Sequence, residues 1–299
     1  MPVMHAAILM ALATLLFATM GVTVKWASAL YGTGEIVFYR GLIGASLMWG
    51  LSRWRGVALA TQVPTLHFWR SASGVSALML WFFAISQLPL ATAVTLNYMS
   101  SVWMALFLIG GAVLLGAKRV DGRLVATVML GFAGVVSVLR PTITPDQMWG
   151  GLAGLMSGML SAMAYLQVKA LGEAGEPEPR IVFYFSLCGM AAGLSVALFS
   201  GGLHAHTWKG LAWLLATGLL ATTAQVLMTR AYAIGRALSN ASLQYLGIVF
   251  SFIYGVALFD DPVHPLALAG MAMIMVAGLA ATLLRTQQVK APDNPPTEY

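Results

Sequence analysis

Ten apolar runs, each close to the roughly 20 residues that a helix needs to cross a bilayer, divide nearly the whole sequence. Only 9% of the residues are charged, whereas a soluble domain carries roughly 25% charge. This composition excludes a soluble globule, and we expect no extramembrane domain. Glycine, proline and charged residues bound the runs at 5–30, 34–51, 66–88, 91–115, 121–139, 148–170, 181–200, 210–233, 237–259 and 266–284.

The runs predict an all-α integral membrane protein with ten transmembrane helices, and short recurring segments divide it into halves. The tetrapeptide Ile-Val-Phe-Tyr at 36–39 returns at 181–184, and Leu-Asn-Tyr at 96–98 matches Leu-Gln-Tyr at 243–245. Five spans in each half would place the second half in the opposite orientation. The sequence therefore predicts a five-plus-five inverted repeat around a central cavity, an architecture typical of secondary transporters.

This interpretation divides the chain into four parts. The expected parts are a first repeat at 1–140, an outer linker at 141–147, a second repeat at 148–285 and a disordered cytoplasmic tail at 286–299. We read the N-terminus as a retained first span, because no basic segment precedes it.

Basic residues set the expected orientation, because cytoplasmic loops of membrane proteins carry excess Lys and Arg. With both termini in the cytoplasm, twelve of the 16 basic residues, Arg70 among them, lie on the cytoplasmic side. The other four are Lys25, Arg40, Arg140 and Lys209. We therefore predict a multi-pass protein of a bacterial inner membrane, and the net charge of +6 reflects topology rather than nucleic-acid binding. Lys25 and Arg40 are expected to snorkel to the outer interface, or else to contact a substrate carboxylate at the mouth.

Acidic residues and histidines fall only at span ends, in loops or in the tail, so no side-chain proton relay is predicted. We expect facilitated diffusion or exchange. No span contains the nucleophile and base or the metal ligands of an intramembrane enzyme, and the single cysteine, Cys188, forms no internal disulfide. The prediction is a protein that is not an enzyme and has no cofactor and no metal.

Uncharged polar side chains gather on one face of several spans, and burying them in lipid without partners would be costly. We therefore expect them to line the cavity. The candidate substrate-binding residues are Thr19, Trp81, Asn97, Tyr98, Ser101, Ser161, Tyr165, Gln225, Asn240, Gln244 and Tyr245. As alternatives, Asn97 and Gln244 could bond neighbouring helices, and the tyrosines could belong to an interfacial belt. The second, fifth, seventh and tenth spans have fewer such groups and are expected to form an outer scaffold.

Two short glycine motifs predict close contact between helices, since the lack of a side chain lets two backbones approach. They comprise Gly41 with Gly44 and Gly131 with Gly134. We assign them to helix packing rather than to ligand binding.

The paired segments at 88–98 and 233–245, with the ten spans, give the chain a resemblance to the drug/metabolite transporter superfamily. Within it, the chain resembles the EamA-type exporters, and most closely the bacterial aromatic amino acid exporter type. The resemblance covers about residues 5–285 and implies a cavity lined by the first, third, fourth, sixth, eighth and ninth spans. The chain departs from the family pattern at Ser101 and Ile248, where the family often has proline, and at Ala117, where the family often has glutamate.

The expected function is alternating-access export of small amphipathic metabolites, especially aromatic and other neutral amino acids. The alternatives are a nucleotide-sugar or organic-phosphate antiporter and a hydrophobic-drug exporter. A phosphate carrier would need basic residues within the membrane, and Arg230 and Lys169 are the candidates considered. The expected partners are a small-molecule substrate and the lipid bilayer, with no nucleic acid, and the protein is expected to be a monomer or a weak homodimer.

Overall fold

The structure, a computed structural model, describes residues 2–114, 122–139, 147–234 and 243–290. All regular elements in these ranges are helices and none is a strand, which confirms the all-α prediction. The helices are α1 (Pro2–Ala27), α2 (Thr33–Arg55), α3 (Pro64–Gln87), α4 (Leu90–Asn97), α5 (Ser100–Leu114), α6 (Gly122–Leu139), α7 (Met148–Glu173), α8 (Glu178–Phe199), α9 (Trp208–Ile234), α11 (Leu246–Phe259) and α12 (Pro265–Lys290).

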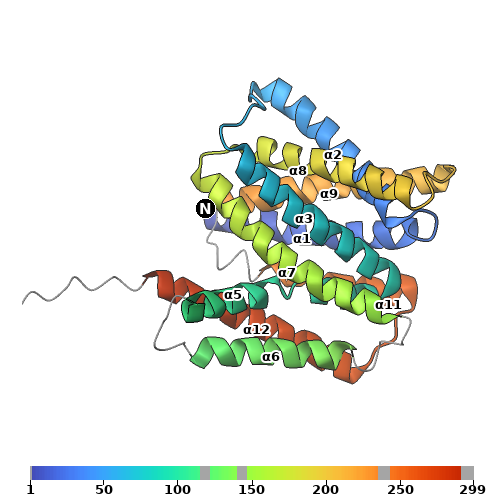
Figure 1. Cartoon of the computed structure of the whole chain (residues 1–299). Helices are drawn as coiled ribbons and strands as arrows, with labels where there is room; N and C mark the ends of the chain where they lie inside the picture. Colours follow the sequence, from blue (N-terminus) through green and yellow to red (C-terminus); the bar gives the residue numbers. More distant parts are fainter. Residues whose placement is uncertain (1, 115–121, 140–146, 235–242, 291–299) are drawn as a thin grey trace, which may run out of the picture.

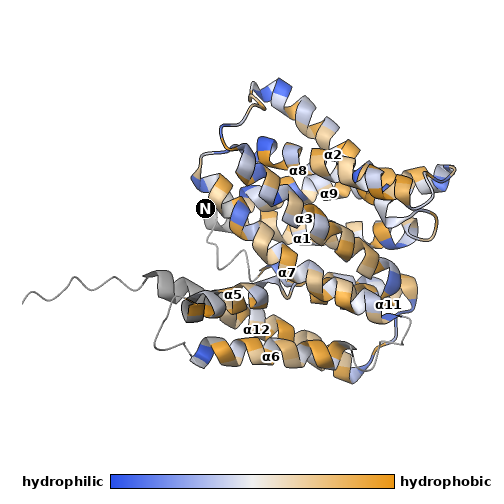
Figure 2. Ribbon diagram, in the orientation of Figure 1, coloured by the Kyte–Doolittle hydropathy of each residue, from blue (hydrophilic) through white to orange (hydrophobic). Residues whose placement is uncertain are grey.

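Six segments of the described chain are long and apolar enough to cross a membrane, and three shorter apolar helices accompany them. The six segments are His5–Ala27, Pro64–Gln87, Leu90–Gly111, Met148–Glu173, Glu178–Phe199 and Trp208–Ala231. Figure 2 shows hydrophobic residues, in orange, recurring along the ribbons of all the helices it labels. The chain is therefore a multi-pass membrane protein.

Each principal helix pair joins the first half of the chain to the second. Helix α2 packs against α8, α3 against α7, α1 against α9, and α6 against α12. Figure 1 shows α1, α2, α8 and α9 on one side of the bundle and α5, α6 and α12 on the other, with α3 and α7 passing diagonally in front. The halves are therefore interleaved and share one core.

Glycines bring α2 and α8 into backbone contact, as the motif predicts. A side chain at Gly41 would overlap backbone atoms of Ser186 and Met190, and one at Gly193 would overlap the backbone of Phe38. Between α6 and α12, a side chain at Gly134 would crowd the carbonyl of Gly270. These glycines therefore act in helix packing.

The fourth span is broken although it has no internal proline. Helix α4 ends at Asn97, α5 begins at Ser100, and the Met99 N–H donates to the Leu96 carbonyl at 3.2 Å, three residues back. A tightened turn of this kind interrupts the regular helix ladder. The last helix also differs from expectation, because α12 runs to Lys290 and enters the segment 286–299 that was predicted to be disordered.

Candidate functional site

Two arginines lie inside the bundle, Arg40 on α2 and Arg70 on α3, and each is 5% exposed. Their guanidinium carbons are 5.1 and 4.4 Å from the centroid of the same ring, that of Phe185 on α8. Arg40 Nη2 also donates to Gln225 Oε1 on α9 at 3.2 Å. The chain therefore brings two cations, one aromatic ring and one amide together from four helices. We call these four residues the arginine cluster.

The arginine cluster contains no counter-charge. Within the described ranges, no Asp or Glu forms an ion pair with Arg40 or Arg70. Nε of Arg40 and both Nε and Nη1 of Arg70 are buried with no hydrogen-bond partner among the described residues. Burying an unpaired charge costs several kcal/mol, so this arrangement is expensive for the fold. The expectation that Arg40 snorkels is wrong, because its side chain is buried against Gln225 and Phe185. Arg70 is buried as well, and its assignment to the cytoplasmic side stays a prediction.

Two predicted amides lie next to predicted hydroxyls on α7. Gln244 Nε2 donates to the Tyr165 hydroxyl at 3.3 Å, and Asn97 Nδ2 donates to Ser157 Oγ at 3.0 Å and Ser161 Oγ at 3.3 Å. The structure thus joins Gln244 to Tyr165, and Asn97 to Ser157 and Ser161, by side-chain hydrogen bonds.

The remaining candidates lie in other contacts. Thr19 shares a hydrogen bond of 3.1 Å with the hydroxyl of Tyr254 on α11, and the Tyr98 and Tyr245 rings meet edge to face at 6.2 Å. Trp81 is 8% exposed, and Ser101 is half-buried on α5. Asn240 lies outside the described residues.

A carboxylate joins three elements at the ends of α1, α4 and α11. Asp261 Oδ2 accepts the Leu90 N–H at 2.9 Å at the start of α4, and Asp261 Oδ1 is 3.4 Å from Lys25 Nζ. Lys25 also donates to the Leu88 carbonyl at 3.0 Å, so its ammonium group lies at the turn between α3 and α4. We call this the Asp261 junction.

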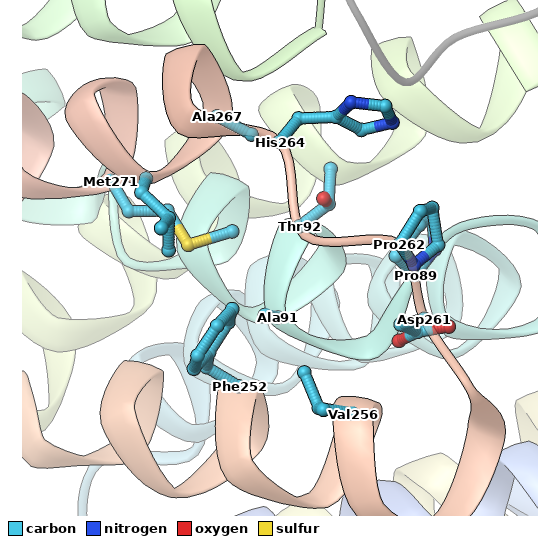
Figure 3. A pocket seen from close by; sticks show the side chains of 11 residues that line it. Pro89, Ala91, Thr92, Phe252, Val256, Asp261, Pro262, His264, Ala267 and Met271 are labelled. Atoms are coloured by element: carbon cyan, nitrogen blue, oxygen red, sulfur yellow. The ribbon is translucent and has the colours of Figure 1, made fainter.

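Two hollows lie on either side of the Asp261 junction. The smaller, in Figure 3, has about 20 Å³ and is lined by Pro89, Ala91, Thr92, Phe252, Val256, Asp261, Pro262, His264, Ala267, Leu268 and Met271. It has room for about one water molecule. The larger is an open vestibule of about 730 Å³, lined by Lys25, Trp26, Ser28, Ala29, Leu30, Ser86, Lys209, Trp213 and Phe259. Of these two hollows, the vestibule is the one large enough to admit an organic solute.

A second carboxylate, Glu176, ties the loop between α7 and α8 to the loop between α2 and α3. It contacts Thr61 Oγ1 at 2.9 Å, His67 Nε2 at 2.9 Å and Arg180 Nη1 at 3.1 Å. Burial raises the pKa of Glu176, but these hydrogen bonds outweigh burial and hold its pKa below the ordinary value of 4.5. Arg180 Nη2 and the Tyr184 hydroxyl also donate, at 2.6 and 3.1 Å, to the carbonyls of residues 58 and 59. These contacts form the Glu176 corner.

A third carboxylate, Glu35, forms the matching corner at the start of α2. It accepts the Gly32 N–H at 3.2 Å, and it accepts the His204 N–H at 2.8 Å from the loop between α8 and α9. The Tyr39 hydroxyl bonds His206 Nε2 at 2.6 Å in the same place. These contacts form the Glu35 corner.

Comparison with known proteins agrees with a transport fold. No family model matches the sequence. The pseudopaline exporter CntI of Pseudomonas aeruginosa is 31% identical over 281 residues, which cover 94% of this chain and 96% of that exporter. A riboflavin transporter of Rhizobium johnstonii is 25% identical, over 91% of this chain and 89% of its own. A solved crystal structure superposes over 97% of this chain and 100% of its own, with a TM-score of 0.64 and 18% identity, which shows the fold alone.

The helical bundle, the polar interior and these relatives together define a multi-pass membrane transporter. Within that class, the chain belongs to the transporter family of the pseudopaline exporter. The relatives are consistent with the drug/metabolite transporter type, and the narrower aromatic amino acid exporter type stays a prediction.

Sequence reasoning missed Arg70 and Phe185 and named Arg40 only as an alternative contact at the mouth, although it found Gln225, which Arg40 bonds. Counting basic residues by side assigns every arginine to a membrane face, and this removed both arginines from the list of cavity residues. Helices α2 and α8 were expected to be outer scaffold, yet they supply Arg40 and Phe185. Arg40 lies seven residues into α2, and its distance from the end of that helix is a signal that could have identified it.

Proposed function

We propose that this protein is an alternating-access exporter of small amphipathic metabolites, built as a ten-span, five-plus-five inverted repeat in a bacterial inner membrane with both termini cytoplasmic. The proposal is carried by the pattern of helix pairing. In the two repeats α1 corresponds to α7, α2 to α8, α3 to α9 and α6 to α12. Exchanging the repeats therefore leaves the pairs α2–α8 and α6–α12 unchanged, and it turns the pair α1–α9 into the pair α7–α3. Two halves related in this way can expose a central site to each side in turn.

The two corners support the same relation residue by residue. Glu35 and Tyr39 of the Glu35 corner correspond, at the repeat offset of 145 residues, to Arg180 and Tyr184 of the Glu176 corner. Tyr39 bonds His206, and the Tyr184 hydroxyl donates to the carbonyl of Leu59. The two partners, Leu59 and His206, are themselves separated by nearly the same offset. In an inverted repeat the two corners lie on opposite faces of the membrane, and each fastens one end of the α2–α8 pair.

For the substrate, we propose aromatic and other neutral amino acids or metabolites of similar size. The support is chemical: aromatic rings such as Trp26, Trp213 and Phe259 line the vestibule, and amide and hydroxyl groups meet inside the bundle. Apolar walls with a few placed polar groups suit an amphipathic solute. The relatives are named for other solutes, pseudopaline and riboflavin, so the substrate has to be found by direct assay.

The test is flux through proteoliposomes that contain the purified protein. The panel contains labelled phenylalanine, methionine, glutamate and a nucleotide sugar, each measured with and without a pH gradient. Saturable flux that exceeds flux in protein-free vesicles supports the proposed transport. Flux of phenylalanine and methionine that ignores the gradient supports a facilitative amino acid exporter. Flux of the nucleotide sugar alone would replace the proposal with an organic-phosphate antiporter.

A further inference from the structure

The arginine cluster narrows the substrate class of the proposed transporter. We propose that Arg40 and Arg70 form an anion site for a carboxylate of the transported solute, and that the protein prefers solutes that carry a free carboxylate. The inference depends on the proposed transport function and concerns the interior of the same bundle. Sequence reasoning had offered Arg40 only as an alternative contact for a substrate carboxylate at the mouth, and had placed Arg70 on the cytoplasmic side.

The first argument is the charge balance. Both guanidinium groups are buried, they lie against one ring, and no described carboxylate pairs with either of them. Replacing such a charge with an apolar side chain of similar size is often neutral or stabilising, so stability does not account for the pair. Ionisable residues placed in the membrane interior at this cost typically mark a substrate path. A bound anion would supply the missing negative charge.

The second argument is the set of unused donors. Gln225 occupies Nη2 of Arg40, while Nε of Arg40 and Nε and Nη1 of Arg70 have no partner among the described residues. The Phe185 ring lies beside both groups and offers no acceptor for these N–H donors. Donors along a guanidinium edge match the two oxygens of a carboxylate.

The third argument concerns the kind of anion. The group that Arg40 bonds is neutral, the Gln225 amide, whereas Lys25 is engaged by Asp261 in the separate junction. A phosphate dianion has three acceptor oxygens and gains from additional cations, which the cluster does not provide. The Phe185 ring offers an apolar surface beside the charge. The cluster therefore fits an organic carboxylate with an apolar part better than it fits a phosphate ester.

The experiment compares four probes of similar aromatic size. These are N-acetylphenylalanine, an anion; phenylalanine, a zwitterion; phenylalaninamide, a cation without a carboxylate; and phenyl phosphate. Flux is measured in proteoliposomes, and thermal stabilisation by each probe is measured on the full-length protein in detergent. We expect N-acetylphenylalanine to be preferred over phenylalaninamide by about tenfold or more, the loss that follows from removing a charged hydrogen bond.

The variants are Arg40→Met and Arg70→Met, with Arg53→Met as the matched control, because Arg53 is exposed at the end of α2. We expect both interior variants to keep or raise the Tm of the unliganded protein and to lose the preference for N-acetylphenylalanine. The control should retain it. Met variants that melt far below the wild type and lose flux of every probe alike would show a structural role and overturn the inference. Equal handling of all probes, or a preference for phenyl phosphate, would also overturn it.

The two readouts separate this inference from the transport proposal. Carboxylate-specific stabilisation that disappears in Arg40→Met and Arg70→Met, without flux of any probe, would support the anion site and reject transport of these solutes. Flux that is indifferent to charge and to both variants would support transport and reject the anion site.

Discussion

Gly74 provides the space that Arg70 occupies. A side chain at this position on α3 would overlap Arg70 Nη1, and it would lie 3.1 Å from Cε2 of Phe185. We predict that Gly74→Ala displaces the guanidinium without removing its charge. Apparent affinity for N-acetylphenylalanine should fall about fivefold, which corresponds to roughly 1 kcal/mol. The KM of flux measures this loss.

Gly50→Ala is the matched control for Gly74→Ala. Gly50 is an exposed residue of α2, and a side chain there would meet no atom within 4 Å. Both substitutions favour the helix by about 1 kcal/mol, so a difference between them reports on Arg70. Equal KM values for the two variants would show that Gly74 does not control the position of the Arg70 guanidinium.

The Glu176 corner predicts a pH dependence of stability. Because folding lowers the pKa of Glu176 below 4.5, folding favours the ionised carboxylate. The ionised carboxylate stabilises the fold fully at pH values above the pKa of Glu176 in the unfolded chain. This stabilisation is lost as the pH falls through the lower pKa of Glu176 in the folded protein. We predict that the Tm of the wild type falls more steeply between about pH 5 and about pH 3 than the Tm of Glu176→Gln. Parallel curves would show that Glu176 contributes nothing to acid sensitivity.

Residue-level prediction succeeded where the side chain is polar and uncharged. A buried amide needs a partner, and Asn97 and Gln225 are buried as this need predicts, while Gln244 is half-buried. The role of these amides in substrate binding stays a prediction. The same need could not locate Arg40 and Arg70, because a long basic side chain can reach a membrane face from several turns away. Only the packing of α8 against α2 and α3 shows that they turn toward Phe185.

At the scale of the element, the end of α4 depends on the contact of Asn97 with α7. Asn97 donates to both Ser157 and Ser161 and is 6% exposed, whereas Gln244 is half-buried and donates to Tyr165. We predict that Asn97→Ala lowers stability by about 1–2 kcal/mol and also lowers transport. Gln244→Ala should lower transport with little change in Tm. Unchanged flux in both variants would exclude both amides from the route.

The α2–α8 contact predicts a severe effect at Gly41. Backbone atoms of Ser186 and Met190 stand where a side chain would be, so they cannot move aside as a flexible side chain can. We predict that Gly41→Val separates the two helices and lowers the yield of folded protein at least severalfold, measured by size-exclusion chromatography in detergent. Gly50→Val on the same helix serves as the control. A normal elution profile for Gly41→Val would contradict the contact.

The hydropathy pattern located the helices well, because a bilayer admits few alternatives to an apolar helix of sufficient length. It joined α4 and α5 into one run, however, since the turn at Tyr98 and Met99 is made by backbone hydrogen bonds and leaves no proline in the sequence. Helix α2 also falls outside the six candidate spans, and it carries Glu35, Arg40, Arg53 and Arg55. The pattern of apolar residues thus gives positions along the chain but not the breaks within a span.

At the scale of the whole molecule, the inverted repeat predicts that the two corners face opposite sides of the membrane. Residues 58 and 206 are exposed at the Glu176 and Glu35 corners. In a Cys188→Ala background, we predict that His206→Cys reacts with an impermeant maleimide added outside intact cells, and that Ala58→Cys reacts only after lysis. Labelling of both cysteines from the same side would reject the inverted repeat.

The interleaved helix pairs also bear on how the protein is made. While the first half is being inserted, α1, α2 and α3 have emerged. Their main partners, α9, α8 and α7 respectively, have not been synthesised. During that interval, Arg40 and Arg70 lack Phe185 and Gln225, and the glycine face of α2 borders lipid. The early intermediate is therefore a set of inserted but undocked helices. Its protection from degradation depends on how quickly the ribosome supplies the second half.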